Sequence, residues 1–320
     1  MAEFDLIARI RDRVPARADV LLGIGDDAAL LHVPEGQALV VSCDTLNAGV
    51  HFPLDTVPAD IGHKALAVNL SDLAAMAAQP AWCTLSLSLP EAAVGWIDAF
   101  LDGFLALAQT HGIALVGGDT TRGPLSICVT VHGLVPDALA LRRSGAQAGD
   151  ELWLTGSVGD AAAALALRAS TNPIDPMLIT RLHRPLPRVA AGLALRGLAH
   201  ACIDVSDGLL ADLGHVLVAS GVGALVELAR LPTSTALAAA MRESERWPLQ
   251  LAGGDDYELC FTAAPEQHDA IVAALAAVDT PAQVIGRLTP APGLQVIAAD
   301  GSAYTPTRGG FQHFSGNDNE

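Results

Sequence analysis

Hydrophobic and polar positions repeat along this chain with two different periods, and the period changes from one segment to the next. Apolar residues recur every three to four positions over 58–78 and 92–111, which predicts two long helices. Between them, residues 82–89 alternate as a half-buried strand does. Residues 37–43 are almost continuously apolar and are predicted to form a buried strand, and 125–135 is rich in strand-forming residues. The first half of the chain is therefore predicted to mix strands and helices.

The other segments extend this pattern. Residues 1–13 predict an amphipathic helix, with Phe4, Ile7 and Ile10 on one side. They lack the apolar core and cleavage site of a secretory signal. A short apolar strand is predicted over 113–116, ending at the pair Gly117-Gly118. In the second half we expect strands at 151–155, 203–205, 223–228, 259–262 and 284–288, and helices at 160–169, 189–199, 209–219 and 265–277.

Pro, Gly, Ser and two arginines interrupt the apolar periodicity between residues 136 and 149, which indicates a domain boundary. We expect an amino-terminal domain over 1–136, a linker over 137–149, a carboxy-terminal domain over 150–314 and a loose tail over 315–320. Mixed strands and helices in both blocks predict a two-domain fold of the α/β or α+β class.

Charge narrows the classes of partner. Apolar residues make up 51% of the chain and charged residues 17%, so the chain can bury a large core. The formal net charge is −17 and Lys64 is the only lysine, which argues against non-specific binding to nucleic acid or an anionic membrane. No uninterrupted run of about 18 apolar residues occurs, so no membrane span is expected. The same charge would repel a phosphate ligand unless a cation lies between them.

The five cysteines are odd in number and widely spaced, without zinc-ligand or redox spacing. Such cysteines behave mostly as small hydrophobic residues, and a reducing cytoplasm fits this usage.

Aspartates recur where the predicted strands end, at Asp26-Asp27, Asp44, Asp119, Asp204 and Asp207. Each of these alone is also what a turn or a helix N-cap contains, so a single one would indicate only local structure. Together they favour one shared site.

Asp72 is unusual because it lies inside a helix that is apolar nearly all round, three residues after Asn69 on the same face. A carboxylate there must be paired or metal-bound, and Lys64 on the same face is the competing partner.

Carboxylates that converge repel one another unless a divalent cation lies between them, and Mg²⁺ prefers oxygen ligands. The sequence contains neither a G-x-x-x-x-G-K-[ST] loop nor the protein-kinase signature set. Phosphates would therefore be bound through metals, glycine-rich backbone amides, and arginines such as Arg122 and Arg143. Residue chemistry alone predicts multi-metal phosphoryl chemistry.

Motifs along nearly the whole chain closely resemble those of thiamine-monophosphate kinases, in that family's order and spacing. This family belongs to the aminoimidazole ribonucleotide synthetase-like, or PurM-like, ATP-binding superfamily. The matching stretches are GIGDDAALL (23–31), SCDTLNAGVHF (42–52), KALAVNLSDLAAMAAQPAW (64–82), GGDTTRGP (117–124), RSGAQAGD (143–150), IDVSDGLLADLGH (203–215), GGDDYELCF (253–261) and Gly310-Phe311.

The resemblance implies a set of site residues. Magnesium ligands would be Asp27, Ser42, Asp44, Asp72, Asp119, Asp204 and Asp207, together with Cys43 through its backbone carbonyl. Catalysis would depend on Asp44, Asp72 and Asp119. ATP contacts would come from Gly118, Asp119, Arg143 and Ser206, and substrate contacts from His51, Asp255 and Phe311.

One motif departs from the family pattern. The family usually has Gly-Gly-Glu-Asp-Tyr-Glu-Leu, whereas position 255 here is Asp. Whether this shorter side chain reaches the substrate directly or through water stays open. Glu258 alternates with Tyr257 and Leu259 and is predicted to point outward into solvent.

The resemblance further implies ATP-dependent phosphorylation of thiamine monophosphate to thiamine diphosphate, with release of ADP and assistance from several Mg²⁺ ions. It implies a cytoplasmic homodimer whose amino-terminal sheets pair into a barrel. Three alternatives remain at this point: a synthetase of the same superfamily that activates an amide or carbonyl oxygen, a Mg-nucleotide binder without turnover, and a metal-dependent phosphatase.

Overall fold

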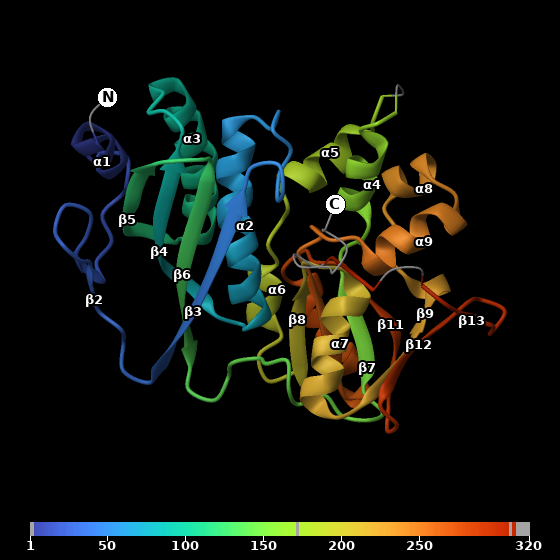
Figure 1. Ribbon diagram of the computed structural model, residues 1–320. Coiled ribbons are helices and arrows are strands. Elements are labelled where there is room, and N and C mark those ends of the chain that lie inside the picture. Colours follow the sequence, from blue (N-terminus) through green and yellow to red (C-terminus); the bar gives the residue numbers. More distant parts are fainter. Residues whose placement is uncertain (1–2, 171–172, 307–308, 312–320) are drawn as a thin grey trace. The chain divides into compact units, whose positions relative to one another are not determined.

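The computed structural model describes residues 3–170, 173–306 and 309–311, which form two compact units (Figure 1). The first unit contains Met1–Leu73 and Ala77–Ala140, and the second contains Ala74–Met76 and Leu141–Glu320. The chain thus passes finally into the second unit between residues 140 and 141. The predicted loose tail over 315–320 lies outside the described residues.

The first unit is built on a four-stranded sheet in the order β3-β6-β4-β5. Neighbours are antiparallel except β4 and β5, which are parallel and are joined by a helix. The strands are β3 (Gln37–Asn47), β4 (Gln79–Leu89), β5 (Ala114–Arg122) and β6 (Ser126–Pro136). Helices α2 (Pro58–Ala75) and α3 (Val94–His111) follow the long apolar periods, as predicted from the sequence.

Helices α2 and α3 lie on one side of this sheet, and the opposite face of β3 is open (Figure 1). The strand predicted over 37–43 is confirmed within β3, but its predicted burial is wrong, because Leu39 and Val41 are 46% and 54% exposed. β3 is the edge strand of the sheet, and the side chains on its outer face lack a covering layer within this unit. An apolar run is typical both of a central strand and of an edge strand that a partner covers.

β5 continues through Gly117-Gly118 to Arg122, so the strand predicted over 113–116 is real but too short. A two-stranded hairpin, β1 (Val20–Leu22) with β2 (Leu30–Leu31), packs near β5 over a small cluster that includes Trp82 and Val116. Helix α1 (Glu3–Arg11) precedes the hairpin.

α2 and α3 approach each other at two glycines. A Cβ atom on Gly103 would lie 1.8 Å from the carbonyl oxygen of Ala59, and one on Gly62 would lie 2.0 Å from that of Phe100. The two helix backbones are therefore in direct contact at a point where no larger residue fits.

The second unit is built on a seven-stranded sheet in the order β13-β12-β9-β11-β7-β10-β8. All neighbours are antiparallel except β12 and β9. The strands are β7 (Glu151–Thr155), β8 (Ala201–Val205), β9 (Gly223–Glu227), β10 (Glu258–Ala263), β11 (Ala282–Thr289), β12 (Gly293–Ile297) and β13 (Ala303–Tyr304).

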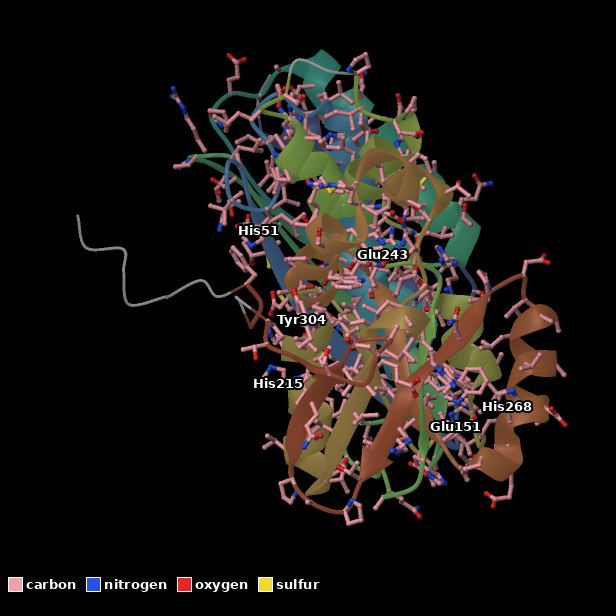
Figure 2. The ribbon with its side chains drawn as sticks, turned by 90° about the vertical axis from the view of Figure 1, so that its right-hand side faces the viewer. His51, Glu151, His215, Glu243, His268 and Tyr304 are labelled. Carbon is pink, nitrogen blue, oxygen red and sulfur yellow. The ribbon has the colours of Figure 1, made fainter. Side chains whose placement is uncertain are left out.

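Helices cover this sheet on both faces. Leu152 and Leu154 of β7 belong to the same core cluster as Leu213 of α7 (Leu209–Ser220). Trp153, between these leucines, contacts the ring of His268 in α10 (His268–Ala276) with centroids 4.9 Å apart. Figure 2 shows His268 beside Glu151, with its Nδ1 2.9 Å from Glu151 Oε2. Burial on both faces explains why the three central residues of β7, Leu152 to Leu154, are all apolar.

The remaining helices of the second unit are α4 (Asp160–Leu167), α5 (Pro176–His183), α6 (Val189–Ala194), α8 (Thr235–Ala240) and α9 (Glu243–Ala252). The sequence predicted α4 and α6 but missed α5, α8 and α9. Over the described ranges, no helix is long and apolar enough to cross a membrane.

We expect Gly103→Ala to lower the free energy of unfolding by about 1–3 kcal/mol, because the added methyl forces α2 and α3 apart. Gly95→Ala, also in α3, is the matched control, since a Cβ atom added at Gly95 would have no neighbour within 4 Å. That control should be neutral or stabilising by up to about 1 kcal/mol. Chemical denaturation followed by tryptophan fluorescence measures both, and equal effects of the two substitutions would contradict the packing argument.

Candidate active site

The first unit contains a cavity of about 830 Å³ beside the end of its sheet. It is lined by α1, by the loop over residues 23–29, and by parts of β4 and β5. This cavity brings together three predicted site residues, Asp27, Gly118 and Asp119, from segments about 90 positions apart. Both aspartates are exposed, so their carboxylates are accessible to a ligand.

Local hydrogen bonds shape the two loops that carry these acids. Asp26 Oδ1 accepts from the backbone N–H of Asp27 at 2.8 Å, and Asp119 Oδ1 accepts from that of Thr120 at 2.8 Å. Gly118 has a φ of 148°, and a Cβ atom there would lie 1.8 Å from the carbonyl oxygen of Leu85. Only glycine fits this close approach of β5 to β4, and it leaves the backbone of residue 118 open to a ligand.

A second group of predicted residues lies where β3 faces α2. Ser42 Oγ donates to Asp72 Oδ2 at 2.6 Å, and the backbone N–H of Asp44 donates to Asn69 Oδ1 at 3.0 Å. Asp72 is half-buried, as expected, and the hydroxyl of Ser42 provides it with a partner. Cys43 points to the opposite, exposed face, where its sulfur lies 3.3 Å from that of Cys128.

These two groups are separate within the unit. Strand register places Asp44 opposite Val129, Val129 opposite Leu85, and Leu85 opposite Gly118. Asp44 and Gly118 therefore lie in one row across four strands, three strand spacings or about 14 Å apart. Ser42, Asp44 and Asp72 are not among the residues that line the cavity.

Three loops meet in the second unit and carry four further predicted residues. The backbone N–H of Asp255 donates to the carbonyl oxygen of Ser206 at 2.9 Å, and that of Phe311 donates to the carbonyl oxygen of Asp207 at 2.9 Å. Asp204 lies at the end of β8, just before this meeting point, and is 5% exposed. Residues far apart in the sequence are thus joined by main-chain hydrogen bonds.

Sequence reasoning missed Asp212, which shapes the loop between β8 and α7. Its Oδ2 accepts from the backbone N–H groups of Ser206, Asp207 and Gly208, at 2.9, 3.0 and 3.2 Å. Gly208 is the N-cap residue of α7, so Asp207 is not an N-cap, and the N–H groups that Asp212 binds belong to the loop just before the helix. Burial raises the pKa of Asp212 to about 6, although these N–H groups favour its ionised form.

Asp255 and Tyr257 both have left-handed backbone conformations, with φ of 70° and 53°. Such conformations cost a non-glycine residue about 1–2 kcal/mol each. The hydroxyl of Tyr257 donates to Asp255 Oδ1 at 3.0 Å, so the carboxylate at position 255 is held in place.

Glu258 is fully buried, so the prediction that it points into solvent is wrong. Burial opposes its ionisation, but hydrogen bonds from Arg188 and the charge of Arg181 outweigh that effect and lower the pKa of Glu258. The alternation with Tyr257 and Leu259 did not predict this, because every residue of β10 is buried, on both faces of the sheet.

Two predicted ligand contacts lie elsewhere. Arg143 is exposed, and its carbonyl oxygen accepts from Ser220 Oγ at the C-terminal end of α7, opposite to the end that carries Gly208. His51 follows β3 and accepts from the N–H of Asn47 through Nδ1 at 2.9 Å (Figure 2). Their contacts with ligands stay predictions.

No three His, Cys, Asp or Glu side chains come together as a metal site in the part of the chain that the structure describes. The residues present nevertheless suit Mg²⁺, because each group offers carboxylate and hydroxyl oxygens without nitrogen or thiolate ligands. Magnesium is commonly held by one or two carboxylates together with substrate phosphates and water. The pair of Asp27 and Asp119 in one cavity meets that requirement.

Comparison with known proteins identifies the family. The family model of the AIR synthase related protein, N-terminal domain, matches residues 25–135, and that of the C-terminal domain matches residues 147–299. Over 320 residues the chain is 48% identical to thiamine-monophosphate kinase of Salmonella typhimurium, covering 98% of each chain. The chain belongs to the thiamine-monophosphate kinase family.

Solved structures agree with this placement. Thiamine-monophosphate kinase of Stenotrophomonas maltophilia K279a is 55% identical, with a TM-score of 0.88 over 95% of this chain and 98% of that one. AaThiL, solved in complex with AMPPCP and TMP, is 30% identical, with a TM-score of 0.76 over 97% and 96% of the two chains. The hydrogenase maturation protein HypE, at 20% identity and a TM-score of 0.77, shares the fold. The predicted PurM-like two-domain fold is confirmed, while the dimeric barrel stays a prediction.

We expect Asp212→Ala to lower the free energy of unfolding by about 2–3 kcal/mol, because three backbone N–H groups lose a charged acceptor. Asp269→Ala is the control, since Asp269 occupies the first turn of α10 but is exposed. It should change stability by less than about 1 kcal/mol. Denaturant titration compares the two, and a wild-type midpoint for Asp212→Ala would refute its role in shaping the loop.

Proposed function

We propose that this protein transfers the γ-phosphoryl group of ATP to thiamine monophosphate, forming thiamine diphosphate and ADP. The observation that carries the proposal is the cavity of the first unit, which joins Asp27 and Asp119 in a chain of this kinase family. The AaThiL complex with an ATP analogue and TMP supports the same pair of substrates.

The nucleotide is assigned to this cavity. Its volume of about 830 Å³ is large enough to hold a nucleotide. Ile10 and Leu115 supply apolar surface for a base, and the backbone at Gly117-Gly118 offers amide groups for phosphates. Gly118 and Asp119 are the proposed ATP contacts at this cavity, and the ATP contacts predicted for Arg143 and Ser206 belong to the second unit.

In the first unit, magnesium would be held by Asp27 and Asp119 at the cavity and by Asp44 and Asp72 with Ser42 beside α2. In the second unit, Asp204 and Asp207 at the end of β8 are the proposed magnesium ligands. Bound there, magnesium would neutralise phosphate charge. The protein's own contribution is to orient these oxygens, as Ser42 orients Asp72 at 2.6 Å.

The acceptor is a phosphate monoester whose second pKa is about 6, so it is mostly dianionic at neutral pH and needs no general base. Its thiazolium cation suits the carboxylate of Asp255 and the ring of Phe311, which is 47% exposed. His51 is assigned to the substrate as well. We expect direct in-line transfer, which inverts the configuration at the transferred phosphorus.

One assay separates the remaining candidates. Thiamine diphosphate formed from thiamine monophosphate and MgATP supports the kinase. ADP released only with an amide or carbonyl acceptor would indicate a superfamily synthetase, free phosphate would indicate a phosphatase, and no ATP consumption would indicate a nucleotide binder. Cytoplasmic location is part of the same proposal.

We expect Asp27→Asn and Asp44→Asn each to lower kcat/KM by about a hundredfold or more, because each removes a negative charge from a predicted metal site. Asp137→Asn, at an exposed position just after β6, should retain wild-type turnover. Steady-state formation of thiamine diphosphate at saturating Mg²⁺ is the measurement. Wild-type kcat/KM in either site variant would remove that residue from the proposed site.

We also propose a homodimer in which the open face of the first unit's sheet is covered by a second copy. Leu39 and Val41 on β3 are half-exposed apolar residues on an edge strand, and such a surface favours association.

Val41→Glu should weaken the dimer about a hundredfold or more, because it buries a carboxylate in the proposed interface. Val218→Glu on α7 is the control, since Val218 is 85% exposed and lies in the second unit. Sedimentation velocity across a concentration series measures the association constant. A monomeric wild type, or an unchanged constant in Val41→Glu, would contradict this interface.

A further inference from the structure

The segment 253–258 places half-buried Asp255 beside two fully buried acids, Asp256 and Glu258. Asp256 is 1% exposed and Glu258 is 0% exposed, whereas Asp255 between Gly254 and Asp256 is half-buried. Acidic side chains are almost never this deeply buried unless they are paired. Their partners therefore reveal what holds the segment.

Glu258 is held by two arginines and a threonine from three other elements. Arg188 forms a bidentate pair with it, Nε to Oε2 at 2.6 Å and Nη2 to Oε1 at 2.7 Å. Arg181 of α5 donates to Oε1 at 2.6 Å, and Thr155 Oγ1 donates to Oε2 at 2.7 Å. Planar arginine–carboxylate pairs of this kind fix orientation as well as charge.

Asp256 is held from a different direction. Both of its carboxylate oxygens accept from the backbone N–H of Gly159, at 2.9 and 3.0 Å. The Arg181 guanidinium also reaches the carbonyl oxygen of Asp256, at 3.4 Å. The same arginine thus contacts both the side chain of residue 258 and the main chain of residue 256.

The anchored residues alternate with the two left-handed residues. Asp255 and Tyr257 have positive φ, and the residue that follows each of them is buried and bonded to another element. Unfavourable backbone conformations persist only where the surroundings determine them. Main-chain bonds from Asp255 to Ser206 and from Tyr257 to Val205 complete the restraint.

We propose that Glu258 is a positioning residue for acceptor recognition: with Arg181, Arg188 and Thr155 it holds segment 253–258 in the conformation that presents Asp255. This inference rests on the proposed acceptor site at Asp255. Glu258 does not touch the acceptor in this scheme and acts through the backbone of residues 255–257. Acceptor affinity should therefore depend on Glu258 more strongly than nucleotide affinity does.

The test uses the full chain with two variants and one control. Glu258→Gln removes the charge that the arginines bind. Thr155→Val keeps side-chain shape but removes the hydroxyl, which donates to Glu258 and accepts from the N–H of Leu259 at 2.8 Å. Thr262→Val is the matched control, because Thr262 is 1% exposed on β10 and its hydroxyl has no hydrogen-bond partner among the described residues.

We expect Glu258→Gln to raise the KM for thiamine monophosphate about tenfold and Thr155→Val to raise it about threefold, with the KM for ATP changed less than about twofold. Calorimetric titration of thiamine monophosphate in the presence of AMPPCP and Mg²⁺ should show the same loss of affinity. Thr262→Val should match the wild type in both measurements.

Three results would overturn the inference: an unchanged acceptor KM in folded variants, equal changes in both KM values, or a loss of kcat that merely follows the fraction of folded protein. Should Glu258→Gln fail to fold, Thr155→Val decides the matter alone. Wild-type protein is assayed first. If it forms no thiamine diphosphate, the proposed function is refuted, and the calorimetric titration of thiamine monophosphate alone then tests the positioning role of Glu258.

Discussion

Negative charge without lysine partners is the physical constraint on which this structure depends. With a net charge of −17 and one lysine, most carboxylates must be stabilised by something other than an ammonium group. Asp212 accepts hydrogen bonds from three backbone N–H groups, Asp72 accepts one from a serine hydroxyl, and Glu258 forms ion pairs with two arginines. Asp27 and Asp119 instead stay exposed in a cavity. The fold thus contains acids that protein donors stabilise and acids that face solvent, and the oxygens of the latter are accessible to a ligand.

Much of the fold follows from periodicity, and its failures have local causes. β7 was predicted with its correct bounds, because its three central residues, Leu152 to Leu154, are apolar as expected of a strand buried on both faces. β3 also has an apolar run, yet its outer face is exposed within the first unit. Its burial was mispredicted because an apolar run does not distinguish a strand covered on both faces from one with an open face. The strand predicted over 113–116 was too short, because glycine ends many strands. Here Gly118 instead permits a close approach of β5 to β4, and the strand continues to Arg122. α9 was missed because Pro248 lies inside it.

The candidate site was predictable as a set of motifs, not as a geometry. Resemblance named Ser206, Asp207, Asp255 and Phe311, and the structure joins their backbones. Asp212 lies only four to six residues after the loop N–H groups that it binds, so its role is local in sequence. Glu258 carried none, since Arg181 and Arg188 are 77 and 70 residues away in sequence. Long-range pairing of charges is invisible to patterns that extend over one helix turn or one strand.

Burial of charge also explains why the two kinds of acid respond differently to change. A carboxylate that is already desolvated and paired, as Glu258 is, has met its desolvation cost in folding, so its loss disturbs backbone position around residues 255–257. A carboxylate that faces water, as Asp119 does, is desolvated only when a ligand arrives, so its interaction energy is available to binding and to the reaction. Sequence motifs do not separate these roles, because both kinds of residue are acidic and lie at strand ends. Solvent exposure separates Glu258, which is fully buried, from Asp119, which is exposed, but it does not assign a role by itself, because the proposed magnesium ligand Asp204 is only 5% exposed.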